Sequence, residues 1–484
     1  MYILRIIEKL LIIYYLSYFA IDILLYLIFI ISISSSKKRK SERENIPELS
    51  VSIIVPAYNE EVSIVNCIEM LRNLDYPDYE IIVVNDGSSD RTMEILLETY
   101  QPQNQEILSG TDFIKTSEIR QLYLKEGTNL KFIDKENGGK ADAINAGINY
   151  SVKDFICTID ADSILDKNAL HHVMKQFEQR EETFVAGGQL AAANGVVIEN
   201  NRVKSLKMPS NLWVLWQITE YIKSFLISRI GLGKMNALLV MSGAFSVFRK
   251  SDLLAAGGYL SQKNDHPYLV QTIGKHKKTL CEDMEVVVRL WRFKHENRQK
   301  AKAVFLPQPV CWTEVPDNGR NLYKQRVRWH TGLAESLFFH LKMLFEPSYK
   351  ATGMFAMPYY FFFELMSPLM KVVTVLFIIP ASVTGLINLS WVIMLIIGTT
   401  LITAIITSSM TVITEYWSYR QDEANRSALR YRSFREWLLL ILSSIMSDFS
   451  YSFFRSFAQL HGLVNFALKK SSWNKFERKG IKRV

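Results

Sequence analysis

A long apolar segment near the N-terminus constrains the fold of this chain most strongly. Residues 10–33 contain no Lys or Arg, and Asp22 is their single charged residue. At 1.5 Å per residue, a helix of this length can cross a hydrocarbon core of about 30 Å. A cleaved signal peptide is the alternative, but the segment is too long and no small-residue cleavage site follows it. The sequence therefore predicts a retained membrane helix with its N-terminus outside, because the basic run 37–43 marks the cytoplasmic side.

Further apolar segments lie in the C-terminal part of the chain. Residues 359–387 are predicted to begin at the membrane interface and then to cross the bilayer, and residues 391–413 form a clear span. Residues 437–468 are apolar but contain Asp448 and Arg455, so they form one span, a short hairpin or an interfacial helix. The basic tail that follows favours the hairpin or the interfacial helix, because it places the C-terminus in the cytoplasm.

The charge of the chain agrees with a membrane location. The net charge of +9 would also suit a nucleic-acid-binding protein. However, the densest basic clusters, 37–40 and 469–483, adjoin apolar segments, where positive charge contacts lipid headgroups. We therefore expect membrane lipid as a partner and no nucleic acid. The four cysteines have neither metal-ligand spacing nor a disulfide pattern, which predicts reduced thiols.

Apolar strands alternate with helices in the polar region between the membrane segments. The predicted strands are residues 50–56, 81–84, 130–133 and 155–159, and the predicted helices are 60–74, 91–100 and 140–150. Asn59 is expected to cap the first of these helices, and the polar stretch 101–126 is expected to be a surface loop or insertion. This alternation predicts an α/β domain with a doubly wound, Rossmann-like, mostly parallel sheet that binds ligands at its carboxyl edge.

The rest of the polar region is less regular. Helices are predicted at 212–230, from Ser251 and at 282–293, and strands at 241–248 and 303–305. Residues 322–345 are amphipathic, which predicts a helix on the membrane surface. The expected units are an N-terminal membrane helix (1–36), the α/β domain (47–335), an amphipathic interface helix (336–358), C-terminal membrane and interface helices (359–468) and a basic cytoplasmic tail (469–484).

Polar motifs follow the predicted strands. Asp160 and Asp162 come directly after strand 155–159 and would point the same way if that strand continued. Such a pair can hold a divalent cation, although a solvated turn is the simpler interpretation of this segment alone. Five further motifs occur in order: Pro56-Ala57-Tyr58-Asn59-Glu60, Asn85-Asp86-Gly87-Ser88-Ser89, Asn137-Gly138-Gly139-Lys140, Cys281-Glu282-Asp283 and Gln325-Arg326-Val327-Arg328-Trp329. Each motif alone is compatible with a turn, a cap or a surface face, but their order predicts one site.

The set of motifs resembles the family 2 glycosyltransferases of GT-A fold, in particular their processive, membrane-embedded branch. That branch includes cellulose, hyaluronan and poly-N-acetylglucosamine synthases. The resemblance covers residues 50–344 and the flanking membrane helices. It implies a GT-A catalytic domain, a UDP-sugar donor, Mg²⁺ or Mn²⁺ as the cofactor, and a growing polysaccharide as the acceptor.

The resemblance also implies roles for individual residues. On the donor side, the nucleotide pocket would contain Pro56, Ala57, Tyr58, Glu60 and Asp86. Lys140 would lie near the diphosphate. Asp160 would contact the nucleotide sugar and the metal, and Asp162 would be the more direct metal ligand. Arg328 would also bind the nucleotide sugar, and it would lie with the acceptor residues Gln325 and Trp329 where donor and acceptor meet. Asp283 would be the general base beside Glu282, and Ser242 and Gly243 would belong to an acceptor loop. A simple strand–turn remains the alternative for Ser242 and Gly243.

The chemistry of sugar transfer agrees with these roles. The departing diphosphate gains negative charge, which a divalent ion, Lys140 and Arg328 would stabilise. The acceptor hydroxyl is a poor nucleophile, so Asp283 would take its proton as the bond forms. A single base without a carboxylate nucleophile on the opposite face predicts inversion at the anomeric carbon. Trp329 offers a flat face for a sugar ring, although a membrane-interface anchor is its alternative role.

The sequence therefore predicts a multi-pass plasma-membrane enzyme that polymerises UDP-glucose or UDP-N-acetylglucosamine into a β-linked polysaccharide and moves the product outward. It has fewer N-terminal spans than several relatives, which implies a smaller channel or one shared with an accessory secretion subunit. No domain for a cyclic dinucleotide is expected after the last span. The alternatives are a non-processive transferase acting on a lipid-linked acceptor and an inactive scaffold. The retained carboxylates Asp86, Asp162 and Asp283 argue against the scaffold.

Overall fold

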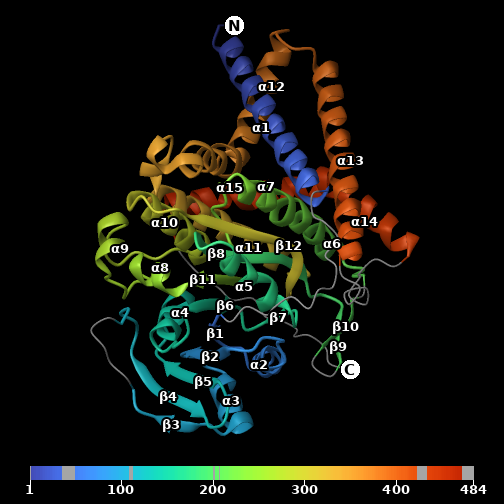
Figure 1. The fold of residues 1–484 in the computed structure, drawn as a ribbon. Coiled ribbons are helices and arrows are strands. Elements are labelled where there is room, and N and C mark those ends of the chain that lie inside the picture. The colour runs from blue at the N-terminus through green and yellow to red at the C-terminus, as the bar shows by residue number, and fades with distance from the viewer. Residues whose placement is uncertain are drawn as a thin grey trace.

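A ten-stranded sheet forms the centre of the α/β domain (Figure 1). The computed structural model describes residues 2–34, 49–107, 113–199, 202–206, 208–421 and 433–470. In sheet order, the strands are β3 (Gln103–Gln105), β4 (Ile119–Lys125), β5 (Leu130–Lys135), β2 (Tyr79–Asp86), β1 (Val51–Ala57), β6 (Phe155–Ile159), β11 (Phe245–Arg249), β8 (Thr183–Ala192), β12 (Lys302–Thr313) and β7 (Ser163–Leu165). A separate pair contains β9 (Val196–Glu199) and β10 (Arg202–Leu206).

The middle of the sheet is parallel. β5, β2, β1 and β6 pair in parallel, and their apolar side chains are buried, as expected for strands covered on both faces. Helix α4 (Lys140–Asn149) packs on β1 and β2, and α3 (Thr92–Tyr100) precedes the β3–β4 edge. The four predicted strands and these two helices are confirmed. Because the parallel strands end at one edge, the loops that follow them come together there.

Outside this parallel middle the sheet is mixed, because β8 and β12 pair in parallel and the other neighbouring strands pair antiparallel. β11 runs antiparallel to its neighbours β6 and β8, and β12 runs antiparallel to β7. At the other edge, β4 runs antiparallel to both β3 and β5. The sheet as a whole is therefore mixed rather than mostly parallel. The loop predicted at 101–126 is wrong, because this stretch contains β3 and β4. Their side chains are largely polar or half-exposed, as is usual for edge strands, and so lack the apolar run of a central strand. The strand predicted at 303–305 extends to the full length of β12.

The first helix of the domain starts later than predicted. α2 (Ile64–Arg72) has Ser63 at its N-cap position, so the prediction that Asn59 caps this helix is wrong. Asn59 has a φ of 53°, in the left-handed region that Asn tolerates. Its side chain instead accepts a hydrogen bond from the Ser89 N–H at 2.8 Å. Asn59 therefore joins two strand-end loops rather than beginning a helix.

Most helices of the domain lie in its second half. Its helices are α5 (Ala169–Gln179), α6 (Leu212–Glu220), the π-helical η1 (Tyr221–Ile227), α7 (Ser228–Lys234), α8 (Lys250–Ala255), α9 (Pro267–Thr272), α10 (Glu282–Glu296) and α11 (Gly319–Phe339). The helix predicted at 212–230 is the continuous run of α6, η1 and α7. The strand predicted at 241–248 begins only at Phe245, because a turn precedes it.

Residues 336–358 do not form the single interface helix that we predict from the sequence. α11 ends at Phe339 and is followed by the short helices η2 (Leu341–Met343), η3 (Pro347–Tyr349) and η4 (Thr352–Ala356). Two non-glycine residues with positive φ, Phe345 and Lys350, flank Pro347 and interrupt the helix.

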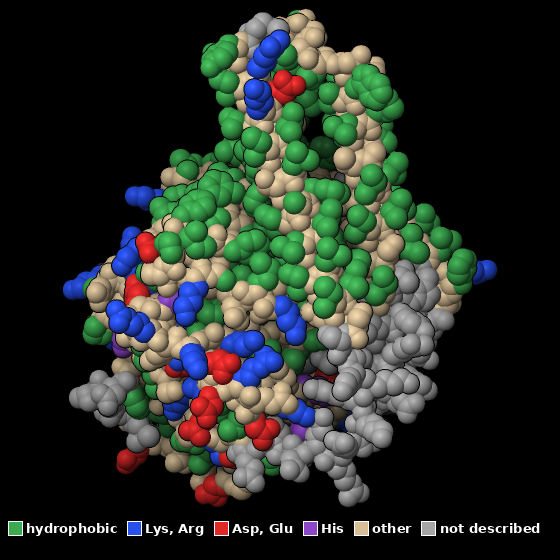
Figure 2. Space-filling model, turned by 45° about the horizontal axis from the view of Figure 1, so that its top comes forward, with side chains coloured by type: hydrophobic (Ala, Val, Ile, Leu, Met, Phe, Trp, Pro, Cys, Tyr) green, Lys and Arg blue, Asp and Glu red, His purple; other side chains and the backbone are tan. Residues whose placement is uncertain are grey.

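Three long helices extend from one side of the domain (Figure 1). They are α1 (Tyr2–Ser34), α12 (Ser367–Val383), which follows η5 (Tyr359–Leu365), and α13 (Leu389–Gln421). Among the described residues, Tyr2–Ser32 and Leu389–Met410 are long and apolar enough to cross a membrane. The pair Thr352–Leu365 and Ser367–Val383, bent by 50°, forms a third span if it is counted as one. Hydrophobic side chains cover this part of the surface (Figure 2).

The last described helices lie at the base of these three. α14 (Phe434–Met446), the π-helical η7 (Ser447–Tyr451) and α15 (Ser452–Ala467) run across the base, and α15 packs along α11 (Figure 1). These three helices are not among the described helices that are long and apolar enough to cross a membrane, and the choice among the alternatives for 437–468 stays a prediction. The predictions for the basic run 37–43 and for most of the tail 469–484 lie outside the described residues.

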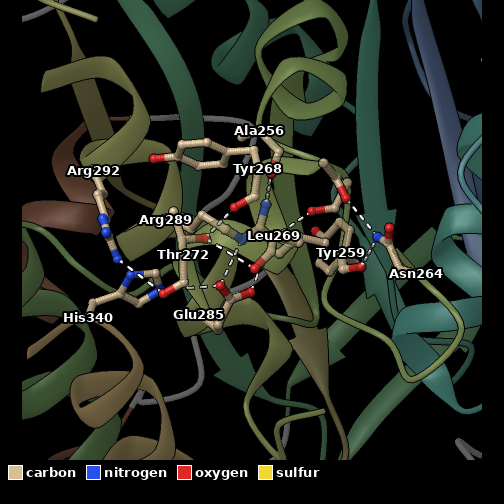
Figure 3. A network of polar contacts seen from close by, with 12 residues as sticks. Ala256, Tyr259, Asn264, Tyr268, Leu269, Thr272, Glu285, Arg289, Arg292 and His340 are labelled. Atoms are coloured by element: carbon tan, nitrogen blue, oxygen red, sulfur yellow. Dashed lines mark hydrogen bonds and ion pairs between the residues drawn. The ribbon is translucent and has the colours of Figure 1, made fainter. Parts of the chain in front are cut away.

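A buried polar network fixes α10 within the domain (Figure 3). The fully buried Arg289 pairs with Glu285 at 2.8 Å and donates to the carbonyls of Ala256 and Gly258. His340, just after α11, lies 3.3 Å from Glu285. Burial alone would raise the pKa of Glu285, but Arg289 and His340 lower it to about 2. The network therefore holds the helix whose first turn carries the predicted catalytic carboxylates.

Candidate active site

Two strand-end loops are tied together at the carboxyl edge of the sheet. The Asn59 N–H donates to the Ser88 hydroxyl at 3.0 Å, in addition to the contact of Asn59 with Ser89. The next residue, Glu60, is buried, and its N–H donates to the Thr92 hydroxyl at 2.8 Å. The loop after β1 therefore lies against the loop after β2. The predicted nucleotide-pocket residues in or beside this loop are Pro56, Ala57, Tyr58 and Glu60.

Asp86, the last residue of β2, organises a third loop. Its carboxylate accepts the N–H groups of Gly138 at 3.0 Å and Gly139 at 2.8 Å, and it pairs with Lys135 at 2.6 Å. Lys135 is fully buried and also pairs with Asp142 at 2.7 Å. The roles of Lys135 and Asp142 are not predicted from the sequence. The one sequence signal for Lys135 is that a lysine ends β5, the strand beside β2. Asp86 thus fixes the start of α4, and its contact with uracil stays a prediction.

Lys140, the first residue of α4, lies at the centre of a group of carboxylates. Its Nζ is 2.7 Å from Asp160 Oδ1, 3.0 Å from Glu282 Oε1 and 3.3 Å from the carbonyl oxygen of Gly243. Burial alone would lower the pKa of Lys140, but the carboxylates of Asp160 and Glu282 outweigh it and raise the pKa. The ammonium group therefore stays charged over the whole range in which enzymes work. We call Lys140, Asp160, Gly243, Glu282 and Asp283 the Lys140 cluster.

Asp283 occupies the first turn of α10, and its Oδ2 accepts the N–H of Gly243 at 3.0 Å. Burial and the neighbouring Glu282 carboxylate raise the pKa of Asp283, while Lys140 opposes them. A carboxylate with a raised pKa is a stronger base than an ordinary one. A raised pKa suits a general base, and this role of Asp283 stays a prediction.

Gly243 allows Lys140 and Asp283 to approach the same turn of the backbone. A Cβ atom at this position would lie 3.0 Å from Lys140 Nζ and 3.2 Å from Asp283 Oδ2, so a larger residue would press on both groups. Ser242 is buried, and its hydroxyl accepts the N–H of Ala244 at 3.2 Å, which closes the turn before β11. The backbone of this turn thus contacts Lys140 with a carbonyl and Asp283 with an N–H.

Asp160 and Asp162 occupy the turn between β6 and β7. β6 ends at Ile159, so the strand does not continue through the two aspartates, and the condition under which both would point the same way is not met. The Asp160 side chain is 28% exposed and pairs with Lys140, whereas Asp162 is 6% exposed. No group of three His, Cys, Asp or Glu side chains suited to a metal occurs in the part of the chain that the structure describes. An oxygen-only pair fits Mg²⁺ or Mn²⁺ if phosphate and water oxygens complete the coordination.

The predicted acceptor motif lies on α11, next to the cluster. The Cys281 thiol, directly before Glu282, is 3.7 Å from the carbonyl oxygen of Trp329. A Cβ atom at Gly332 would collide with Cys281, so this glycine lets α11 approach the start of α10. Arg328 is half-buried and close enough to Cys281 to affect it electrostatically. α11 is therefore packed directly on the helix turn that carries Glu282.

Gln325 and Trp329 share one partner that sequence reasoning misses. Arg326 donates to Gln325 Oε1 at 2.7 Å, and its guanidinium carbon lies 4.2 Å from the centre of the Trp329 ring. Its position inside the motif is the only signal that the sequence offers for this role. The aromatic residues Trp213 and Trp216 pack against each other and against Phe454 and Tyr451, which makes them packing residues.

Comparisons with known proteins identify the family of the chain. The family model described as "Glycosyltransferase like family 2" matches residues 47–332. Poly-beta-1,6-N-acetyl-D-glucosamine synthase of Staphylococcus epidermidis is 27% identical over 299 residues, which are 62% of this chain and 57% of that protein. The synthase of the same name from Staphylococcus aureus (strain COL) is 27% identical over 295 residues, which are 60% and 57% of the two chains. The chain thus spans a little over half the length of the curated relatives it matches.

A solved structure supports the fold. The mannosyltransferase PcManGT from Pyrobaculum calidifontis, in complex with GDP-Man and Mn²⁺, superposes with a TM-score of 0.53 and 16% sequence identity. The superposition covers 92% of this chain and 99% of that chain. It confirms the predicted GT-A-like α/β fold.

Proposed function

This chain belongs to the family 2 glycosyltransferases, and from that premise we propose that it extends a β-linked polysaccharide from a UDP-sugar by an inverting, processive reaction. The observation that carries the proposal is the Lys140 cluster, in which a cation, several carboxylates and a turn backbone meet at the ends of the strands. The long apolar helices support a location in the plasma membrane and a route for the product.

We propose UDP-N-acetylglucosamine as the first donor to test and UDP-glucose as the second. The two staphylococcal relatives, named as poly-beta-1,6-N-acetyl-D-glucosamine synthases, support this order. The acceptor would be the growing polymer, and an accessory secretion subunit would share its passage through the membrane.

The proposed mechanism assigns the donor to the strand ends. Asp160 and Asp162 would hold Mg²⁺ or Mn²⁺ together with the diphosphate, and the ion would neutralise charge on the leaving group. PcManGT, which was solved with Mn²⁺, supports this choice of metal. Lys140 would move its ammonium group from Asp160 toward the diphosphate and stabilise the same negative charge. Asp86 would hold the loop that presents Lys140.

The acceptor would approach from the side of α11. Asp283 would take the proton of the acceptor hydroxyl as its oxygen bonds to the anomeric carbon. The bond from that carbon to the phosphate oxygen of UDP would break at the same time, so UDP would leave from the opposite face and the configuration would invert. The Gly243 N–H would keep the Asp283 carboxylate oriented. Trp329 would stack on a sugar ring, with Gln325 and Arg328 beside it.

The pH dependence of the reaction tests the role of Asp283. Asp283 must be deprotonated to act as a base, so kcat/KM should fall when acid protonates it. An ordinary aspartate has a pKa of about 3.9. Because burial and Glu282 raise the pKa of Asp283, kcat/KM should begin to fall at a higher pH than it would with an ordinary aspartate as the base. Glu282→Gln removes the negative neighbour and should move this acidic limb about one pH unit lower. An acidic limb that stays in place in the variant would contradict the assignment of Asp283.

Turnover with separate donors tests the proposed function itself. Purified, detergent-solubilised enzyme is incubated with Mn²⁺ or Mg²⁺ and one UDP-sugar at a time, while UDP release and product length are measured. Long polymer from UDP-N-acetylglucosamine or UDP-glucose supports the proposal. Single additions under excess donor would contradict processivity, and transfer to an added lipid-linked acceptor would favour a non-processive enzyme instead. No turnover with any donor or acceptor would contradict the proposal as a whole.

A further inference from the structure

We propose that Arg326 is a positioning residue for the acceptor motif, and that Glu220 and Tyr451 hold it from two other parts of the fold. Arg326 occupies a position in the motif that the resemblance leaves without a role. The inference deepens the proposed function and rests on it, because it assumes that Gln325 and Trp329 contact the acceptor.

One face of Arg326 contacts the motif. The side chain is 3% exposed. It donates to Gln325 at 2.7 Å and lies over the ring of Trp329 at 4.2 Å. A guanidinium group is suited to this double contact because it is planar, always charged and able to stack on an aromatic face. Arg326 therefore restricts the orientation of both Gln325 and Trp329, whose ring also packs against Phe225.

The other face of Arg326 is held by residues far away in the sequence. Its Nη2 is 2.5 Å from Glu220 Oε2, and its Nε donates to the Tyr451 hydroxyl at 3.1 Å. The Tyr451 hydroxyl in turn donates to Glu220 at 2.7 Å, and Arg455 pairs with Glu220 at 3.3 Å. Arg326, Glu220, Tyr451 and Arg455 therefore form hydrogen bonds and ion pairs with one another. Buried charged groups need such partners, because burying a charge without one is costly.

This contact joins three elements of different origin. Glu220 is the last residue of α6, and Arg326 lies on α11 (Figure 1). Tyr451 is the last residue of η7, directly before α15 begins. The Tyr451 ring also stacks on Trp216 of α6. The guanidinium group of Arg326 thus links the helices at the base of the membrane segments to Gln325 and Trp329, in addition to the packing of α15 along α11.

The connection predicts an effect on the acceptor and not on the donor. The donor side of the site is held by a different set of contacts, centred on Lys140, Asp86 and the loops after β1 and β2. Loosening Arg326 should therefore weaken binding of the polymer end and shorten the product. It should leave the affinity for UDP unchanged.

Two variants test the inference. Tyr451→Phe removes one hydroxyl from the contact and keeps the ring on Trp216, and Arg326→Lys keeps the charge but loses the planar fork. We expect the dissociation constant for a β-linked N-acetylglucosamine oligosaccharide to rise about threefold in Tyr451→Phe and about tenfold in Arg326→Lys. The product should shorten in the same order, and UDP affinity should stay within about twofold of the wild type. The matched control is Tyr268→Phe, which removes a hydroxyl bonded to Glu296 at 2.9 Å and should leave all three measurements unchanged.

Each other outcome overturns the inference. Unchanged oligosaccharide affinity in Tyr451→Phe would do so even if Arg326→Lys fails to fold. A parallel loss of UDP and oligosaccharide affinity would show a general structural role, and wild-type enzyme that binds no oligosaccharide would show that the motif has another ligand. Failure of the proposed function is recognised separately, because the wild-type enzyme would then form no glycosidic product from any donor.

Discussion

Asp283→Asn is expected to abolish glycosyl transfer while the fold and donor binding are retained. Asparagine has the same shape and can still accept the N–H of Gly243, which Asp283 accepts at 3.0 Å. It cannot take a proton from the acceptor hydroxyl, and loss of a positioned general base costs about 10²- to 10⁴-fold in rate. We expect kcat, measured as UDP release with donor and acceptor present, to fall about 10³-fold. The UDP dissociation constant should stay within about twofold of the wild type, because the variant keeps the ion pairs of Lys140 with Asp160 and Glu282.

A carboxylate outside the cluster provides the control for this variant. Asp252 on α8 pairs with Lys294, and Asp252→Asn should leave kcat unchanged. If Asp283→Asn keeps kcat within about tenfold of the wild type, the base must be another group. If it loses affinity for UDP as well as turnover, Asp283 belongs to the donor site.

The strands that the sequence predicts best are those in the middle of the sheet, where both faces of the sheet are buried. β1, β2 and β6 have continuous apolar runs, so their positions and the helices between them follow from residue pattern alone. β4 could not be predicted in this way, because half-exposed, polar side chains interrupt its apolar pattern at the sheet edge. The interruption after α11 depends on two residues with positive φ, Phe345 and Lys350, whose side chains do not indicate that conformation.

The same distinction applies to the site. Asp86, Lys140 and Asp160 could be grouped in advance because parallel strands end at one edge of a sheet. The contact of Gly243 with Asp283 depends on how α10 packs against the turn before β11, which residue spacing does not reveal. The contacts of Arg326 with Glu220 and Tyr451 likewise join residues more than a hundred positions apart.

Lys140→Met is expected to remove donor binding as well as transfer. Methionine has a similar length but no charge, so Asp160 and Glu282, which lie 2.7 and 3.0 Å from the ammonium group, lose their shared cation. A diphosphate would then approach carboxylates that repel it, and each lost charged hydrogen bond costs about 1.5–3 kcal/mol. We expect the UDP dissociation constant to rise and kcat to fall, each by about 100-fold.

The acidic limb of the pH profile separates the two roles of Lys140. Because Lys140 lowers the pKa of Asp283 against the effect of burial, its loss should raise that pKa further and move the acidic limb to higher pH. Lys153→Met, which breaks an ion pair with Asp78 away from the cluster, should change neither the limb nor UDP affinity. A shifted limb with unchanged UDP affinity would show that Lys140 serves only the carboxylates of the chain. Weak UDP binding with an unshifted limb would show that it serves only the diphosphate, whereas our mechanism requires that both change in the same variant.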